Sequence, residues 1–306
     1  MNFDIGYNLT KELECIFNSL QMPGAEISCA VIDMSGEAPL LFGYNMEKFQ
    51  YPASVVKLFV AGEVLRQIDV GLLTLDQVVE IAPINVVGDP RNIFSQKHDP
   101  SLLDQHNASI DSLLSAMLSS SSNTASNVLI DLVSRESINV GIVQRFNWHG
   151  SELTRKFLSR DKEDVNYRNA PMTKSCARHL CEFVYLVENN GLISEFVSTS
   201  LRGYMQKCKD PHNVSLSLNE FDNYYHKNGS VETGVWSYGL VFALKSLLRG
   251  SWKKDRWLND CGIVYYRRKK YAICMLTHCQ TYFNNQLFPM KMISEKILAI
   301  ISASDL

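Results

Sequence analysis

Ser54 and Lys57 stand three residues apart at the start of an apolar stretch, YPASVVKLFVAG. Residues at this spacing share one face of a helix. A serine hydroxyl is a weak nucleophile that needs a nearby base, and a lysine can be that base when burial or a neighbouring cation lowers its pKa. The free backbone N–H groups and positive dipole of the first helical turn could also hold an oxyanion. The pair therefore predicts acyl chemistry at Ser54, although the same spacing recurs at Ser251 and Lys254.

Such chemistry needs two further groups: a hydroxyl that passes a proton to the leaving group, and a cation that holds an anionic substrate. The stretch SSSSNTASN offers Ser121 and Asn123 at a break between two helical patterns. The stretch HKNGS offers Lys227 on a late strand pattern, followed two residues later by Gly229, which would let a substrate approach the backbone closely.

In this order, the three motifs resemble the Ser-x-x-Lys, Ser-x-Asn and Lys-Thr/Ser-Gly signature of class A β-lactamases and penicillin-binding proteins. The stretch SSNTASNVLI resembles the S-D-N-T-A-x-N-x-L-L of that family, and NDCGIVYY and YAICMLTH resemble its last two strands. The similarity extends over nearly the whole chain. It implies an α/β (α+β) fold of the β-lactamase/transpeptidase type, in which helices flank an antiparallel sheet and an all-helical subdomain is inserted.

The resemblance also implies a role for each matching residue. Ser54 would be the acylated nucleophile, and Lys57 its base or proton relay. Ser121 would pass the proton to the leaving nitrogen, while Lys227 would anchor a substrate carboxylate and polarise Ser121. The positions implied in substrate binding are Asn123, which would hold a side-chain amide of the substrate, Asn228, Gly229, and Ser230, whose backbone N–H would form the oxyanion hole with that of Ser54.

Two residues inside the motifs depart from the family pattern. Ser122 stands where class A enzymes usually have Asp. Asn228 stands where they have Thr or Ser, so a hydroxyl that would contact the substrate carboxylate is missing.

A third departure lies in the loop LTRKFLSRDKEDVNYRNAPMT, where class A enzymes carry E-P-E-L-N and its first Glu activates the deacylating water. Aligning residues 165–166 with the Leu-Asn end puts Lys162 at the place of that Glu. The neighbouring Glu163 is the candidate deacylation base if the register is shifted, but a charged loop favours a solvated side chain there. We therefore expect an acyl-enzyme that forms readily and is hydrolysed slowly.

Two other functions fit the same residues. One keeps the enzyme but changes the substrate, as in a peptidase, an esterase or a glutaminase-like enzyme of the same fold. The other is a catalytically retired binding module, which Asn228 and the missing Glu would allow and which the complete set of Ser54, Lys57, Ser121 and Lys227 argues against.

The composition of the chain argues against several classes of partner. A net charge of −2 argues against nucleic acid or an acidic membrane surface, and no run approaches the roughly 18 apolar residues of a membrane span. The eight cysteines include no C-x-x-C, and the seven histidines no H-x-x-x-H, so we expect free thiols, no metal and no cofactor. We expect a small-molecule or peptide substrate and leave the oligomeric state open. The absence of a visible signal peptide predicts a cytoplasmic protein unless a leader was trimmed, whereas the family usually works outside the cytoplasm.

The elements that must position these residues are strands at both ends of the chain around a helical middle, which indicates one sheet with a helical insertion. We expect a single domain over 1–306, divided into 1–50 plus 200–306 (the sheet with terminal helices) and 51–199 (helical, with the Ser-x-x-Lys helix and the Ser-x-Asn loop). The patterns predict helices at 7–20, 54–68 (buried) and 291–302, two helices meeting at the serine-rich break, and strands at 25–33, 38–45, 223–230, 261–269 and 270–278. The basic run at 267–270 is expected to be a hairpin turn.

Overall fold

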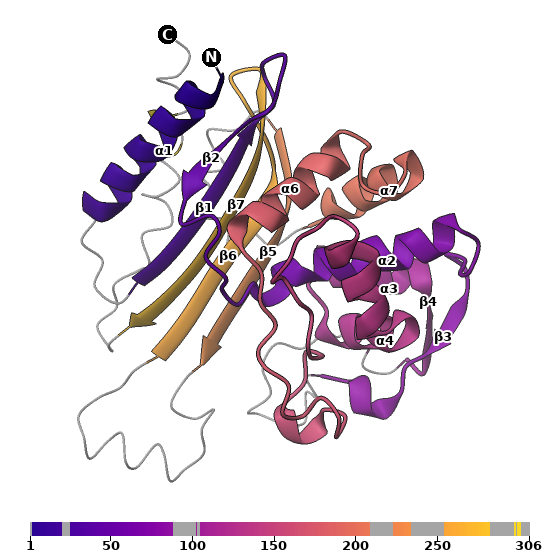
Figure 1. Cartoon of the computed structure of the whole chain (residues 1–306). Helices are drawn as coiled ribbons and strands as arrows, with labels where there is room; N and C mark the ends of the chain where they lie inside the picture. Colours follow the sequence, from indigo (N-terminus) through magenta and orange to yellow (C-terminus); the bar gives the residue numbers. More distant parts are fainter. Residues whose placement is uncertain are drawn as a thin grey trace, which may run out of the picture.

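The computed structural model describes residues 2–19, 25–87, 102, 105–208, 223–233, 254–281, 297, 299 and 300. Its centre is a five-stranded sheet in the order β2-β1-β7-β6-β5, and each neighbouring pair is antiparallel. Figure 1 shows that strands from both ends of the chain lie side by side in this sheet. The strands are β1 (Ala25–Asp33), β2 (Leu40–Tyr44), β5 (Asn223–Thr233), β6 (Lys254–Tyr266) and β7 (Lys269–Thr281).

All five expected strands are present, and β6 begins at Lys254 rather than at 261 because it pairs with both β5 and β7 over that stretch. The expected hairpin between the last two strands is confirmed. Arg267 and Arg268 have φ values of +48° and +64°, and two consecutive positive φ angles are the mark of the tight turn that suits the twist of paired strands.

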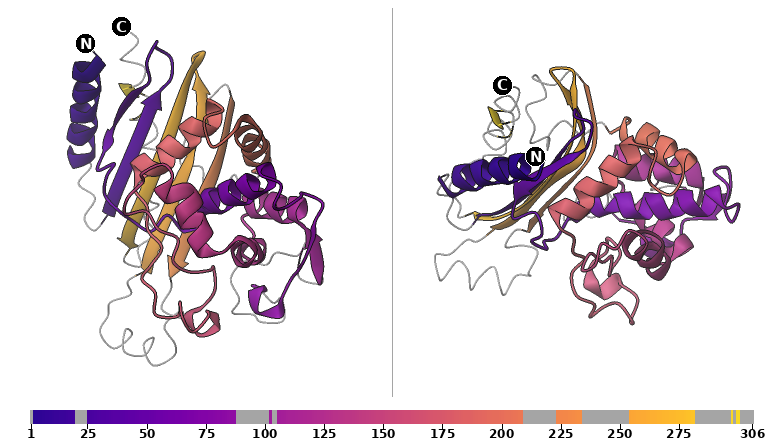
Figure 2. Two further views of the ribbon diagram at one scale, coloured as in Figure 1. Left: turned by 45° about the vertical axis from the view of Figure 1, so that its right-hand side comes forward. Right: turned by 45° about the horizontal axis from the view of Figure 1, so that its top comes forward.

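Helices cover both faces of the sheet, as Figure 2 shows. On one face lies α1 (Asn2–Ser19), whose Leu13 and Phe17 pack against Val31 and Tyr271 of the sheet. On the other face lies α6 (Ala177–Glu188), with the remaining helices beyond it. Since both faces are covered, β1 is buried along nearly its whole length. The antiparallel sheet flanked by helices confirms the expected fold class.

The other helices are α2 (Lys57–Asp69), α3 (Ile110–Ser119), α4 (Asn123–Val133), α5 (Arg135–Ile138) and α7 (Glu195–Met205). Short elements complete the described part of the chain: the strands β3 (Val78–Glu80) and β4 (Asn107–Ser109), the 3-10 turns η1 (Ala53–Val56), η2 (Pro83–Asn85) and η4 (Arg160–Lys162), and the π-helical η3 (Asn139–Gln144). The two helices expected at the serine-rich break are α3 and α4. The division at residues 51 and 200 stays a prediction. Most of the expected closing helix 291–302 lies outside the described residues.

The helix that follows Ser54 is buried, as its composition predicts. All nine residues from Lys57 to Leu65 are buried, and the Phe59 ring contacts those of Trp148 and Phe183 at centroid distances of 5.8 and 5.5 Å. Even Glu63 is inaccessible to solvent, with its carboxylate paired with Arg66 one turn later at 2.7 Å. A packed apolar helix gives Lys57 a fixed position next to the nucleophile candidate.

Candidate active site

Ser54 lies in η1, at the point where the chain enters α2, and is partly exposed. The preceding Ala53 has φ +49°, in the left-handed region that is strained for a residue with a side chain. Such strain is maintained only where the surroundings enforce it, and it is common at functional sites. The turn therefore presents Ser54 at the head of a rigid helix.

The backbone of β5 lies directly against this turn at Gly229. A Cβ atom on Gly229 would be 2.6 Å from the Ser54 backbone nitrogen and 3.0 Å from the Pro52 carbonyl oxygen. Real Cβ atoms do not approach backbone atoms so closely, so residue 229 must be glycine if the strand is to pack here. This contact brings the Lys-Asn-Gly stretch and Ser54 to one place, as the sequence motifs predict.

Lys57 links the start of α2 to the break between α3 and α4. Its side chain is fully buried, and Nζ donates to the Ser121 carbonyl at 2.7 Å, to Asn123 Oδ1 at 2.8 Å and to Ser121 Oγ at 3.2 Å. The structure thus brings together Lys57, Ser121 and Asn123, three residues that the motifs assign to one site.

The serine-rich break holds Ser121 in an unusual conformation. Ser121 has φ +58° and is partly exposed, and the next residue, Ser122, begins α4 as its N-cap by accepting a hydrogen bond from the Ala125 N–H at 3.0 Å. Asp and Ser are both good N-caps. Ser122 can therefore fill the place of the family's Asp without loss of the helix start.

Lys227 is fully buried on β5 and donates to the Asn228 carbonyl at 2.7 Å and to Asn228 Oδ1 at 3.2 Å. The Asn228 side chain is also buried, and within the described residues its Nδ2 has no hydrogen-bond partner. A buried donor without an acceptor costs about 1–3 kcal/mol. The site therefore favours an acceptor group at the position where the family has a hydroxyl donor.

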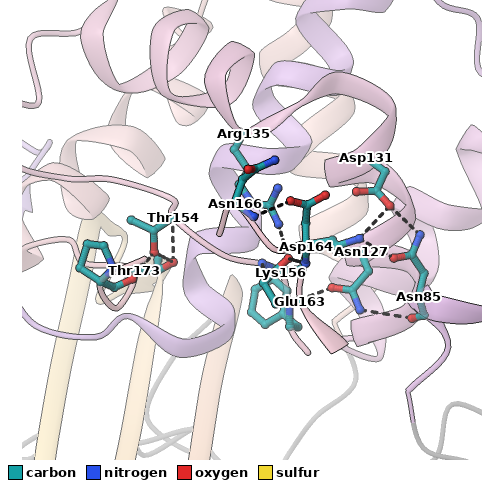
Figure 3. Close-up of polar contacts among 12 residues, drawn as sticks. Asn85, Asn127, Asp131, Arg135, Thr154, Lys156, Glu163, Asp164, Asn166 and Thr173 are labelled. Atoms are coloured by element: carbon teal, nitrogen blue, oxygen red, sulfur yellow. Dashed lines mark hydrogen bonds and ion pairs between the residues drawn. The ribbon is translucent and has the colours of Figure 1, made fainter. Parts of the chain in front are cut away.

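Glu163 is not a solvated charge, and the expectation that it would be is wrong. Its side chain is only 1% exposed, and Oε1 is 2.5 Å from Arg135 Nη2 of α5. The same carboxylate accepts the backbone N–H of Lys156 at 2.8 Å and that of Asp164 at 3.1 Å (Figure 3). The physical reason is the countercharge of Arg135, whose guanidinium is itself covered by the Tyr167 ring at 3.8 Å. Glu163 therefore connects two parts of this loop to each other and to α5.

The loop residue that faces Lys57 is Phe157. Its backbone N–H donates to Asn127 Oδ1 at 2.8 Å, and its ring centroid lies 4.5 Å from Lys57 Nζ. Lys162, which the alignment of residues 165–166 put at this place, is exposed. Sequence reasoning missed Phe157, and the signal that could have found it is Asn127, the last residue of the SSNTASN stretch, whose side chain fixes the register of the loop.

A second set of contacts holds this part of the loop from the other side. Lys156 Nζ donates to Asn85 Oδ1 and to Asp131 Oδ2, both at 2.9 Å, and Asn85 Nδ2 donates to the same Asp131 oxygen at 2.8 Å (Figure 3). Phe157 is thus anchored through its own backbone and through its neighbour. These bonds fix the backbone from which the ring projects towards Lys57.

Among the residues that the structure describes, Glu47, Cys176 and His179 form a group of metal-capable side chains outside this site, with ligand atoms within 4.8 Å of one another. The Glu47 carboxylate is paired with Arg178 at 2.6 Å. Burial raises the pKa of the Cys176 thiol to about 12, which disfavours the thiolate that a metal would need. No helix in the described part of the chain is long and apolar enough to cross a membrane.

Known proteins match this chain over nearly its whole length. A family model described as "Beta-lactamase enzyme family" matches residues 8–301. A solved β-lactamase from Chitinophaga pinensis is 17% identical with a TM-score of 0.71 and covers 97% of this chain and 99% of its own. A β-lactamase from Sphaerobacter thermophilus is 15% identical with a TM-score of 0.68 and covers 96% of this chain and 97% of its own. A mutant of PBP-A in an acyl-enzyme complex with penicillin G is 15% identical with a TM-score of 0.68 and covers 98% of this chain and 97% of its own. At such identities these structures show the fold. No curated protein matched.

Proposed function

Because the chain belongs to the β-lactamase enzyme family, we propose that this β-lactamase-like serine hydrolase acts through an acyl-enzyme on Ser54. The substrate is an amide, a β-lactam or a related acyl compound. The observation that carries the proposal is the buried Nζ of Lys57, one turn after Ser54 and hydrogen-bonded to Ser121 and Asn123. A nucleophile, a base and a second hydroxyl are the groups that acyl transfer needs.

In the proposed acylation, Ser54 Oγ attacks the substrate carbonyl carbon and gives its proton to the Lys57 amine. A neutral amine has two N–H bonds, which the Ser121 carbonyl and Asn123 Oδ1 can accept, and it keeps its lone pair for this proton. When the carbon–nitrogen bond breaks, Ser121 Oγ gives its proton to the leaving nitrogen and takes one from Lys57, which lies 3.2 Å away. The product is an ester on Ser54 and a free amine.

Lys227 and Asn228 support binding of a substrate that carries an acceptor group, such as a carboxylate. Lys227 supplies a buried positive charge, and Asn228 Nδ2 is a donor without a partner among the described residues. A substrate carboxylate would satisfy that donor and neutralise the charge. The amide would then take the part that a hydroxyl has in the family pattern.

We further propose that the ester on Ser54 is hydrolysed slowly. Hydrolysis needs a base that activates water beside the ester. The Phe157 ring covers Lys57 on the side that faces the loop. Both carboxylate oxygens of Glu163 are already used, one by Arg135 and the other by the backbone N–H of Lys156. These contacts favour a structural role for Glu163 over the role of deacylation base.

The test is intact mass spectrometry of the protein after incubation with a panel of penicillins and neutral acyl esters. We expect one acyl group per chain, absent in Ser54→Ala and retained in the matched variant Ser120→Ala, which removes an exposed hydroxyl of the same serine-rich break. Acylation by the esters alone would assign an esterase or a related hydrolase. An adduct that persists in Ser54→Ala, or no adduct with any compound, would contradict the proposal, and binding without acylation would indicate the retired module.

A further inference from the structure

Two cysteines lie directly opposite each other in the middle of the sheet. In the β6–β7 hairpin the cross-strand partner of Cys261 is Cys274, and the register is regular from the turn down to this pair. Directly opposed residues of two strands share one face of the sheet. Both cysteines pack in the hydrophobic core on the face that α6 covers (Figure 1). Their thiols therefore lie on the same side of the sheet.

The separation of the two cysteines follows from the hairpin turn. In a two-residue turn such as that at 267–268, the flanking residues, here Tyr266 and Lys269, are a pair of the hydrogen-bonded kind. Hydrogen-bonded and non-hydrogen-bonded pairs alternate along antiparallel strands. Cys261 comes five residues before Tyr266, so Cys261 and Cys274 form a non-hydrogen-bonded pair. In such a pair the Cα atoms are only about 4.5 Å apart and the side chains are at their closest.

This separation suits a disulfide, which joins residues whose Cα atoms are about 4.4–6.8 Å apart. The backbone of the hairpin would not have to move. Both side chains are buried, and Cys261 Sγ donates to the Leu180 carbonyl of α6 at 3.2 Å. A disulfide carries no hydrogen-bond donor, so its formation would leave no unpaired thiol hydrogen in the core.

The fold selects this pair from the eight cysteines of the chain. In the registers of the described strands, no other two cysteines are cross-strand partners. Cys29 of β1 packs on the other face of the sheet, in the core beneath α1. Cys181 of α6 lies on the same face as the pair, but its Sγ is directed to the Ala272 carbonyl at 3.3 Å.

We propose that Cys261 and Cys274 are a disulfide-forming site, which closes when the chain folds in the presence of a small disulfide compound. One cysteine loses its proton to water, and its thiolate attacks a sulfur of the small disulfide and releases a small thiolate. The thiolate of the second cysteine then attacks the protein sulfur of this mixed disulfide and releases a second small thiolate. The two cysteines lose two electrons, and the small disulfide gains them and becomes two thiols, which take protons from water.

Burial of the pair confines this reaction to folding. The hairpin is closed by a two-residue turn, so it can align the two thiols before α6 covers them. In the folded protein, burial raises the pKa of the Cys261 thiol and raises that of Cys274 well above its usual range. Both shifts disfavour the thiolate that exchange requires. The form that is present when α6 docks, dithiol or disulfide, is therefore retained.

The disulfide would tie together the strands behind a candidate active-site residue. Lys227 of β5 is the cross-strand partner of Cys261 on the side away from β7. Lys227, Cys261 and Cys274 thus form a row across three strands on one face of the sheet. A bond between the two cysteines would fix β6, the strand with which the backbone around Lys227 pairs.

The experiment uses the full chain, reduced and unfolded in urea and then refolded by dilution into a mixture of oxidised and reduced glutathione. Exchange is stopped with acid, and the soluble protein is examined by intact mass and by peptide mapping without reduction. We expect a chain lighter by two hydrogen atoms, in which the peptides of Cys261 and Cys274 are linked. Its midpoint of thermal unfolding should be higher by about 4 °C or more than that of the chain refolded with reduced glutathione alone.

A second arm tests the timing. The chain that has been refolded in reduced form is placed in the same glutathione mixture, and we expect no link between the two cysteines while it stays folded. Rapid formation of the link in this folded protein would overturn the claim that burial confines the reaction to folding.

Variants identify the partners. Cys261→Ala and Cys274→Ala should each lose the link and the difference in unfolding midpoint between oxidised and reduced protein. Cys181→Ala, which removes the neighbouring thiol of α6, should keep both. If an alanine variant of the pair does not fold, the peptide map of the wild-type chain decides. Wild-type protein that regains its native circular dichroism in the mixture without this link, or with Cys181 linked in its place, would overturn the proposal.

Discussion

The Phe157 ring lies over the Lys57 side chain, with 4.5 Å between the ring centroid and Nζ. A hydrogen bond from the Phe157 N–H to Asn127 holds the backbone of the loop in place at this point. The ring packs against the lysine side chain, and an aromatic ring cannot take a proton from water. The position next to Lys57 is therefore occupied by a group that stabilises and does not catalyse.

The first prediction concerns this position. Phe157→Glu should place a carboxylate beside Lys57, because the backbone bond to Asn127 does not depend on the side chain. We expect the lifetime of the penicillin adduct on Ser54 to fall by about 10²-fold or more, as for the gain of a general base. Decay of the adduct is measured by intact mass after excess penicillin is removed. Phe157→Leu, which adds no base, should keep the long lifetime, and equal lifetimes in Phe157→Glu and wild type would refute the argument.

The second prediction concerns Glu163. Glu163→Gln removes the partner of the buried Arg135 guanidinium, and loss of one member of a buried ion pair lowers the free energy of unfolding by about 3–5 kcal/mol. Acylation of Ser54 and the lifetime of the adduct should change little in the protein that remains folded. Urea unfolding and adduct decay are measured side by side.

The matched control for that experiment is Lys162→Ala, which removes an exposed side chain one residue away and should leave both quantities unchanged. The opposite result is a Glu163→Gln protein of normal stability that no longer releases its adduct. It would make Glu163 the deacylation base.

Sequence reasoning predicted the sheet, the buried helix after Ser54 and the residues gathered at its start. It could do so because strand and helix periodicities are local and because the order of the three motifs fixes which elements must meet. The hairpin at Arg267 and Arg268 was likewise a local signal.

The loop was predicted less well, because its conformation is decided by residues far away in the chain. Glu163 is buried because Arg135, 28 residues earlier, lies beside it, and no local pattern contains that fact. Phe157 meets Lys57 because Asn127 of α4 binds its backbone. The contact of His226 with Asp260 depends on the register of β5 against β6.

A third prediction tests the packing of β5 against the nucleophile. Gly229→Ala would put a Cβ 2.6 Å from the Ser54 nitrogen, and because both neighbours are backbone atoms neither can move aside cheaply. We expect acylation to slow by more than about tenfold and the free energy of unfolding to fall by about 1–3 kcal/mol. Gly203→Ala is the control, since a Cβ on Gly203 of α7 meets nothing within 4 Å. Normal acylation by Gly229→Ala would show that the strand is not constrained at this contact.

A fourth prediction separates the two buried lysines. Lys57→Ala should slow acylation by about 10²-fold or more for every substrate, since it removes the base. Lys227→Ala should slow substrates that carry a carboxylate much more than neutral esters, because its charge is used in binding. Single-turnover acylation rates with a penicillin and with a neutral ester give the comparison. An equal loss on both substrates would assign Lys227 to polarisation of Ser121 instead of anchoring.

The last prediction concerns His226 of β5, whose Nδ1 lies 2.8 Å from Asp260 Oδ1 of β6. Burial lowers the pKa of this imidazole, but the Asp260 carboxylate outweighs burial and raises it to about 10 in the folded protein, against about 6.5 in an unfolded chain. Below pH 6.5 both states hold the proton, and the pair with Asp260 contributes fully to stability. Between pH 6.5 and 10 the folded state keeps a proton that the unfolded state has lost, so the free energy of unfolding falls as pH rises, by at most about 1.4 kcal/mol per pH unit. Above pH 10 the contribution is gone.

Urea unfolding at intervals from pH 6 to 10 should therefore show a decline in wild type that is flattened in His226→Gln. His149→Gln, at an exposed position, should follow wild type. Parallel pH dependences of wild type and His226→Gln would mean that the imidazole is not held protonated by Asp260.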